Sequence, residues 1–232
     1  MQPDSSDVVA IIPSAGSGVR LDIKRKKQFL KLASSPLLAE TIHRVSLSKK
    51  IGTIVITAPP DDIDQVATIV DSLLLTNRTL IVPGGKSRQE SVYRGLQSVS
   101  SNPAIILIHD GVRPFVEPSM IDATIEMARL HSGAVTAIKS SDAVRIVKNK
   151  KIASHINRDE LHQIQTPQAF QYQLLLDAHL HAIKHNISGD DDSYLVSQIG
   201  VNSFVLEGSR LNFKITTRED LELARAISIY NK

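Results

Sequence analysis

The chain has 232 residues, a length that suits one α/β domain with an insertion better than two full domains. Its hydrophobic share of 42% is ordinary for a globular protein and sufficient for a substantial core. Cysteine is absent, which excludes disulfides and thiolate metal sites and fits the reducing cytoplasm, where we expect the protein to work. No apolar run approaches the roughly 18 residues of a membrane span, and the polar N-terminus argues against a secretion signal, so we expect no membrane partner.

Short apolar runs rich in β-branched residues alternate, up to residue 138, with longer segments of helical periodicity. The short runs predict strands at 8–12, 53–57, 79–82, 104–108 and 134–138. The longer segments predict helices at 37–47, 62–74, 89–99 and 118–131. Strands that alternate with helices of this length require crossover connections. The sequence therefore predicts an α/β, Rossmann-like fold with a mainly parallel sheet and helices on both faces.

This alternation weakens after residue 138. Polar clusters and apolar residues in the segment 139–155 predict a β-hairpin that turns near Asn149 and projects from the domain. An exposed hairpin leaves strand edges unpaired, and a second subunit commonly covers them, so we expect residues 139–158 to form the dimerisation arm of a homodimer. The remaining segments predict helices at 171–184, 191–199 and 218–230 and a strand at 202–206. Together they complete a single domain over residues 1–232.

A glycine-containing loop at 14–20 follows the first predicted strand directly. Ligands of open parallel sheets bind beyond the carboxyl ends of the strands, where this loop would lie. Gly16 and Gly18 let the backbone approach anionic oxygens closely, and Arg20 and Lys27 would add full positive charge. The stretch of chain that starts at Arg20 and ends at residue 31 holds six basic side chains and a single acid. This concentration of charge indicates a phosphate pocket.

Several other classes of protein use glycine loops or basic patches. A dinucleotide-binding dehydrogenase needs a third glycine where Leu21 stands, and an acid after the second strand, where 58–60 reads Ala-Pro-Pro. A P-loop needs a Gly-Lys-Ser/Thr run that neither loop glycine provides. A nucleic-acid module is disfavoured because the charge is local and the chain has five Phe, four Tyr and no Trp for base stacking, so we expect no nucleic-acid partner. A loop for a nucleoside triphosphate remains, with a plain tight turn as the simplest alternative.

A second polar segment, 108–114, follows the predicted strand at 104–108. Asp110 is placed where a carboxylate can hold Mg²⁺ against phosphate oxygens. Gly111 permits close approach of a ligand, and Arg113 could contact a second phosphate in a bidentate manner. The structural alternative is a turn in which Asp110 caps the chain and Arg113 is paired at the surface. We expect His109 to be structural.

Six motifs together carry a resemblance to a known family. They are 13–20 (PSAGSGVR), 27–30 (KQFL), 84–91 (GGKSRQES), 109–114 (HDGVRP), 166–168 (TPQ) and 214–216 (KIT). With them the chain resembles the 2-C-methyl-D-erythritol 4-phosphate cytidylyltransferases over residues 8–230. The resemblance implies a nucleotidyltransferase of non-mevalonate isoprenoid biosynthesis that uses CTP as co-substrate, releases pyrophosphate and requires Mg²⁺ or another divalent cation.

The resemblance also implies roles for individual residues on the CTP side. Arg20 and Lys27 would stabilise charge on the triphosphate in the transition state and so act in catalysis. Backbone groups near the loop would read the cytosine base. The implied CTP-binding residues are Ser14, Ala15, Gly16, Gly18, Gly85, Ser91 and Asp110.

On the side of the sugar-alcohol phosphate, the resemblance implies a second set. Asp110, with Gly111 beside it, would be the metal-side carboxylate. Arg113 and Lys214 would bind the substrate phosphate, with Lys214 also catalytic. Arg158 would reach into the active site of the neighbouring subunit and act there in catalysis.

Three positions depart from the family pattern. Ala143 removes a threonine hydroxyl that family members offer to the substrate, which keeps the sister enzyme, ribitol 5-phosphate cytidylyltransferase, open as an alternative. A threonine is also replaced in the segment 189–193, where we expect Asp190 or Asp191 to cap the following helix rather than to bind metal. Lys26 replaces a proline and would add charge beside the triphosphate. These changes affect mainly the polyol side of the pocket.

Overall fold

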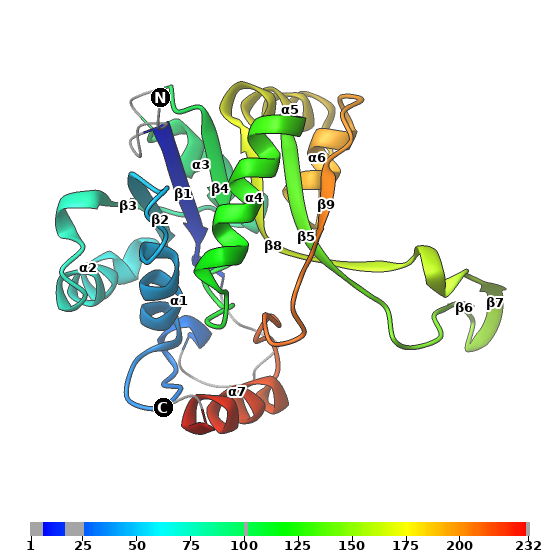
Figure 1. Cartoon of the computed structure of the whole chain (residues 1–232), viewed down its shortest axis with the longest axis horizontal. Coiled ribbons are helices and arrows are strands. Elements are labelled where there is room, and N and C mark those ends of the chain that lie inside the picture. Colours follow the sequence, from blue (N-terminus) through cyan, green and yellow to red (C-terminus); the bar gives the residue numbers. More distant parts are fainter. Residues whose placement is uncertain (1–6, 17–25, 100–101, 231–232) are drawn as a thin grey trace.

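The computed structural model describes residues 7–16, 26–99 and 102–230 (Figure 1). Its main sheet has seven strands in the order β3-β2-β1-β4-β8-β5-β9. Their bounds are β1 Val8–Pro13, β2 Thr53–Ala58, β3 Thr79–Pro83, β4 Ile105–Ile108, β5 Gly133–Lys139, β8 His162–Gln171 and β9 Phe204–Glu207. Only β8 runs antiparallel to its neighbours, β4 and β5, among these described strands. The expectation of a mainly parallel sheet is therefore confirmed.

Seven α-helices accompany these strands in the described part of the chain. They are α1 Leu37–Ser46, α2 Ile63–Ser72, α3 Arg88–Gln97, α4 Pro118–His131, α5 Tyr172–His185, α6 Asp192–Ser197 and α7 Arg218–Tyr230. Each predicted helix is present, with its ends shifted by at most two residues. The predicted strands are present as well.

The core lies on both faces of the sheet because the side chains of each strand alternate between the faces. In β1, Ala10 and Ile12 join one apolar cluster with residues of α1, α2 and α4. Val9 and Ile11 join the opposite cluster with residues of α3, α5 and α6. A strand that is apolar on both faces, as the continuous run at 8–12 predicted, is thus covered by helices on both sides.

The strand β8 was not predicted. Its sequence, HQIQTPQAFQ, contains a proline and several polar residues that are buried in the structure, including Gln165, Thr166 and Gln168. Strand patterns in a sequence are recognised by their apolar residues, so a strand that buries hydrogen-bonded polar side chains escapes them. Inserted between β4 and β5, β8 brings these polar groups to the carboxyl end of β4.

The predicted hairpin is confirmed as an arm that projects from the sheet (Figure 1). It carries β6, Arg145–Lys148, and β7, Lys151–His155, which pair with each other antiparallel and with no other strand that the structure describes. The turn lies at Asn149 and Lys150, whose φ angles of 51° and 61° match the left-handed backbone of a tight hairpin turn. In Figure 1, β5 leads into the arm and β8 leads back out of it.

The C-terminal helix α7 covers the edge of the molecule next to the carboxyl ends of the strands. Leu221 and Ala224 pack with Leu32, Leu37 and Val112 in a third apolar cluster. Just before α7, the backbone N–H of residue 215 donates to the carbonyl oxygen of Val112 over 3.0 Å. These contacts hold the preceding residue, 214, beside the loop that follows β4. None of the helices in the described ranges is long and apolar enough to cross a membrane.

Candidate active site

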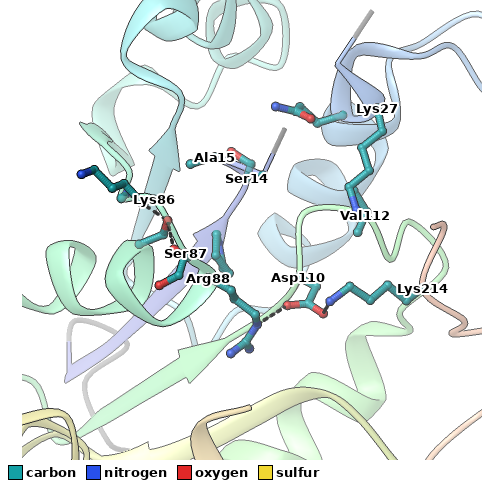
Figure 2. A pocket seen from close by; sticks show the side chains of 14 residues that line it. Ser14, Ala15, Lys27, Lys86, Ser87, Arg88, Asp110, Val112 and Lys214 are labelled. Carbon is teal, nitrogen blue, oxygen red and sulfur yellow. Dashed lines mark hydrogen bonds and ion pairs between the residues drawn. The ribbon is translucent and has the colours of Figure 1, made fainter. Parts of the chain in front are cut away.

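A pocket of about 530 Å³ opens where β1 and β4 end (Figure 2). Segments that are far apart in the sequence line it: 13–16, 27–28, 85–88, residue 91, parts of 110–112 and residue 214. The carboxyl edge of a parallel sheet is where a ligand is expected in this kind of fold.

The loop after β1 is held in place by β2 and β3. Ser14 is buried, and both its backbone N–H and its hydroxyl donate to the carbonyl oxygen of Thr57, at 2.9 and 3.0 Å. Ala15 faces Gly84, at which any added Cβ would overlap the Ala15 methyl group. Among the described residues, a Cβ added at Gly16 would meet no atom within 4 Å, so they leave the backbone there open to a ligand.

The loop 84–87 lies against the loop that follows β1 and leads into α3. Ser87 caps this helix by accepting a hydrogen bond from the backbone N–H of Glu90 at 3.0 Å. Ser91 donates to the carbonyl oxygen of Ser87 at 2.8 Å and accepts from the backbone N–H of Gly85 at 3.0 Å. The Ser91 hydroxyl therefore shapes the loop whose backbone faces the pocket.

Asp110 lies at the centre of the charged groups and is 5% exposed. One carboxylate oxygen accepts from Arg88 Nε at 2.8 Å, and the other pairs with Lys214 Nζ at 2.9 Å (Figure 2). Arg113 Nε lies 3.6 Å from the second oxygen. Burial alone would raise the pKa of Asp110, but Arg88, Lys214 and Arg113 together hold it well below its usual value. Asp110 is thus an ionised carboxylate surrounded by cations.

The partner of Arg88 on its far side was missed by the sequence interpretation. Arg88 Nη1 donates to Asp192 at 2.7 Å, and the other oxygen of Asp192 lies 3.0 Å from His179 Nε2. Arg88 belongs to the motif at 84–91, but its partner is 104 positions away, so no local pattern connects them. Burial alone would lower the pKa of Arg88, yet the carboxylates of Asp192 and Asp110 raise it above its usual value.

Most of the residues that the sequence singled out line this pocket. These are Ser14, Ala15, Gly16, Lys27, Gly85, Ser91, Asp110 and Lys214. Gly18 and Arg20 lie outside the described residues. Lys26, expected beside the triphosphate, pairs with Asp62 over 2.6 Å.

Gly111, Arg113 and Arg158 do not line the pocket. Gly111 is packed tightly, because an added Cβ would lie 3.1 Å from the Cβ of Ser14. Arg113 is buried, and its Nη1 donates to the carbonyl oxygen of Asn212 at 2.7 Å, so it ties the segment that carries Lys214 to the Asp110 loop. Arg158 is exposed on the arm, which Figure 1 shows pointing away from the sheet.

His109 has the surroundings of a structural residue, as the sequence interpretation expected. Burial lowers its pKa to about 4, so the ring is neutral at physiological pH. Its two ring nitrogens lie 3.0 Å from the carbonyl oxygen of Arg113 and 3.1 Å from the hydroxyl of Thr166. The same hydroxyl accepts from the backbone N–H of Asp110 at 3.0 Å, so β8 supports the loop that carries Asp110.

The described residues contain no cluster of three His, Asp or Glu side chains that could hold a metal ion. Asp110 is the one acidic side chain among the described residues that line the pocket. This donor set fits a cation such as Mg²⁺, which keeps several waters and takes phosphate oxygens together with one or two carboxylates.

A mainly parallel sheet with Gly16, a cationic pocket and a buried carboxylate at its carboxyl edge is typical of α/β proteins that bind phosphate groups of nucleotides. The comparison with known families is more specific. The family model for 2-C-methyl-D-erythritol 4-phosphate cytidylyltransferase matches residues 8–229, and the chain belongs to this family. Its members are nucleotidyltransferases, so the dehydrogenase and nucleic-acid alternatives fall away.

Relatives and solved structures agree with this assignment. The chain is 38% identical over 218 residues to the 2-C-methyl-D-erythritol 4-phosphate cytidylyltransferase of Clostridium botulinum (strain Langeland), covering 94% of this chain and 95% of that protein. It is 36% identical to the protein of the same name from Halalkalibacterium halodurans, with the same coverage. The crystal structure of 4-diphosphocytidyl-2C-methyl-D-erythritol synthase from Anaerococcus prevotii superposes with a TM-score of 0.86 at 30% identity, covering 97% of each chain.

Proposed function

We propose that this protein transfers the cytidylyl group of CTP to 2-C-methyl-D-erythritol 4-phosphate and releases pyrophosphate, as a nucleotidyltransferase of isoprenoid biosynthesis. The observation that supports this function best is the gathering of Lys27, Lys86, Arg88 and Lys214 around one pocket, whose described lining residues include a single carboxylate, that of Asp110 (Figure 2). Such a pocket suits two polyanionic substrates better than neutral ones.

The proposed reaction is an in-line displacement at the α-phosphorus of CTP. An oxygen of the sugar-alcohol phosphate forms the new bond to phosphorus, and the bond to the β-phosphate oxygen breaks, so that pyrophosphate leaves with the bonding electron pair. The nucleophile is already anionic and needs no strong general base. The main barrier is repulsion between anions and charge on the equatorial oxygens, which positioned cations reduce.

For CTP, we assign the triphosphate to Lys27 and to Arg20, Gly16 and Gly18 of the glycine loop. The assignment rests on the family motif and, for Lys27 and Gly16, on their place in the pocket wall. The base is assigned to the wall formed by Ser14, Ala15, Gly85 and Ser91. The tight packing of this wall is consistent with a rigid binding site in which backbone groups select one base.

For the sugar-alcohol phosphate, we assign Lys214, Arg113 and Gly111 near Asp110, following the family motif. The contacts of Arg113 with Asn212 and Asp110 give it a second task, because they also hold the segment of Lys214 in place.

We further propose that the triphosphate enters with Mg²⁺ or another divalent cation, which neutralises part of its charge when bound. Asp110 would hold this ion, with phosphate oxygens and water as its other ligands. Because both Asp110 oxygens already contact cations, we expect the phosphates to provide most of the affinity.

The chain would act as one nucleotidyltransferase domain over residues 1–232, with 139–158 as the dimerisation arm of a homodimer in the cytoplasm. Exposed apolar residues on the arm support this proposal: Ile146, Val147 and Ile152 are 46%, 58% and 62% exposed. A two-stranded sheet is marginally stable alone, and a partner subunit would cover these side chains. Arg158, at the base of the arm, would then enter the partner's active site.

The test is release of pyrophosphate from each of the four nucleoside triphosphates with Mg²⁺ and either methylerythritol phosphate or ribitol 5-phosphate. We expect release only with CTP and methylerythritol phosphate. Release with ribitol phosphate alone would assign the sister activity, and no release with either acceptor would overturn the proposal.

A further inference from the structure

Behind the pocket lies a group of buried polar and charged side chains to which the proposed chemistry gives no role. His179 comes from α5, and Asp192 is the first residue of α6; the side chain of each is 1% exposed. Arg88, the first residue of α3, connects this pair to the pocket. We call His179 and Asp192 the anchor pair.

From the anchor pair to the pocket, the charged groups alternate in sign. Asp192 accepts from Arg88 Nη1 at 2.7 Å, Arg88 Nε donates to Asp110 at 2.8 Å, and Asp110 pairs with Lys214 at 2.9 Å. The side chains of Asp192 and Asp110 are buried, that of Arg88 is 22% exposed, and that of Lys214 is 34% exposed. The row therefore begins in the protein core and ends at an ammonium group that faces the pocket.

Arg88 is held from two sides in one geometry. Its planar guanidinium donates through Nε to one carboxylate and through Nη1 to another, and such paired contacts fix orientation as well as charge. Without Asp192, Asp110 would be the one remaining ion-pair partner of Arg88 among the described residues, and the long side chain would regain rotational freedom. The carboxylate of Asp110 and the ammonium of Lys214 would then lose their fixed positions too.

Stability alone gives a weak reason for this arrangement. Burial of an ion pair costs desolvation free energy that the pairing only partly offsets, and apolar side chains of similar size often serve as well. A buried carboxylate can orient an arginine of the pocket wall, whereas an apolar side chain in its place cannot.

We propose that Asp192, oriented by His179, is a positioning residue of the transfer reaction, which holds Arg88 and through it sets Asp110 and Lys214 toward the substrate phosphate. This inference rests on the proposed function, because the reaction must take place in this pocket for the position of Lys214 to matter. Asp192 does not line the pocket and acts through Arg88.

The chain offers a matched pair of variants for the test. Asp191 precedes Asp192, and its side chain caps α6 by accepting from the backbone N–H of Tyr194 at 2.8 Å, with no hydrogen bond or ion pair to Arg88. Asp192→Asn keeps the shape of the side chain and the backbone contact of residue 192 with Gln168, whereas Asp191→Asn removes an equal charge one position away. If Asp192 has a purely structural role, both variants should lower the melting temperature and leave the kinetic constants unchanged.

The experiment measures pyrophosphate release by both variants with CTP and methylerythritol phosphate. We expect Asp192→Asn to lower kcat/KM for the sugar-alcohol phosphate at least 10-fold while KM for CTP stays within about 2-fold. Asp191→Asn should lower the melting temperature yet keep kcat/KM within about 2-fold. Equal kinetics of the two variants, or an effect of Asp192→Asn confined to the melting temperature, would overturn the inference.

A double-mutant cycle then tests whether Asp192 acts through Arg88. In an Arg88→Gln background, Asp192→Asn should cause no further loss of kcat/KM, because the side chain that it positions is already gone. If the two effects multiply, Asp192 does not act through Arg88. Arg88→Lys replaces Arg88→Gln in the cycle if the glutamine variant does not fold.

Failure of the inference and failure of the proposed function give different results. If the wild-type protein releases no pyrophosphate with CTP and methylerythritol phosphate, the proposed function is wrong and the inference falls with it. If the wild type is active and the variants show independent effects, only the inference is wrong.

Discussion

Gly84 lies directly against Ala15, so that a methyl group added at position 84 would overlap the methyl group of Ala15. The loops that follow β1 and β3 thus close on each other, and together they form the wall assigned to the cytosine base. Gly84→Ala should push the two loops apart and raise KM for CTP about 10-fold. This change corresponds to a loss of about 1.4 kcal/mol of binding free energy. Steady-state kinetics with varied CTP measures this change.

The control for that variant is Gly95→Ala. At this position in α3 an added Cβ would lie 2.8 Å from Ile11, so the steric conflict is similar but falls between helix and strand in the core. It should lower the melting temperature while KM for CTP is retained. An unchanged KM for Gly84→Ala would show that the wall tolerates movement.

Lys27→Ala and Arg20→Ala should each lower turnover about 10²- to 10³-fold, the usual loss when one group that stabilises transition-state charge is removed. Lys31→Ala is the control, since this lysine belongs to the same basic stretch but is exposed and does not line the pocket. Circular dichroism should show an intact fold for all three variants. Near-normal turnover of Lys27→Ala would contradict the proposed role of Lys27 in the transition state.

Catalysis shared across a dimer predicts complementation between inactive subunits. Lys27→Ala and Arg158→Ala homodimers should both be slow, whereas mixed dimers contain one site with both native residues. We expect a mixture refolded together to recover up to about a quarter of wild-type turnover, because half of the dimers are mixed and each has one native site. Tagged heterodimers purified from the mixture and found inactive would contradict a role of Arg158 in trans.

Asp192 also predicts a dependence of stability on pH. Burial alone would raise its pKa, but Arg88 and then His179 lower the pKa of this carboxyl below its usual value. A folded-state pKa below the unfolded one means that the ionised group stabilises the fold above about pH 4 and that this contribution is lost as the pH falls through the folded value. The free energy of unfolding of the wild type should exceed that of Asp192→Asn by about 2 kcal/mol at pH 7. This difference should become progressively smaller below pH 4.

Urea denaturation of both proteins from pH 7 to pH 3 measures that difference. Carboxyl groups remote from Arg88 contribute equally to both proteins, so the difference reports Asp192 together with Asp110, which shares Arg88 with it. A gap that stays constant down to pH 3 would mean that the pKa of Asp192 is not lowered by folding.

Features that depend on neighbouring residues could be read from the sequence. The apolar run at 8–12 gave a strand buried on both faces, and the turn at Asn149 was visible from polar residues between apolar ones. The cap of α6 by Asp191 was expected as one of two adjacent candidates, and the structure selects it. Such signals depend on contacts within a few positions, which is the range over which a sequence pattern is informative.

The strand β8 and the partners of Arg88 could not be read in this way. The polar side chains of Gln165 and Thr166 are buried because distant segments offer them hydrogen-bond partners, namely Ser209 and His109. Asp192 is one of three consecutive aspartates that look alike in the sequence, and only folding distinguishes it by burying it beside Arg88. Only the closed fold brings these groups together.

The path of β8 limits which segments of this enzyme can be exchanged with those of a relative. The strand leaves the arm at His162 and, four residues further on, supports the Asp110 loop through the hydroxyl of Thr166. The strand that follows the arm therefore also supports the loop that carries Asp110, so an exchange of the arm that continues into this strand would also affect this part of the site. A chimera that borrows the arm of a relative should exchange only the stretch between Lys139 and His162 and keep the native strand from there on.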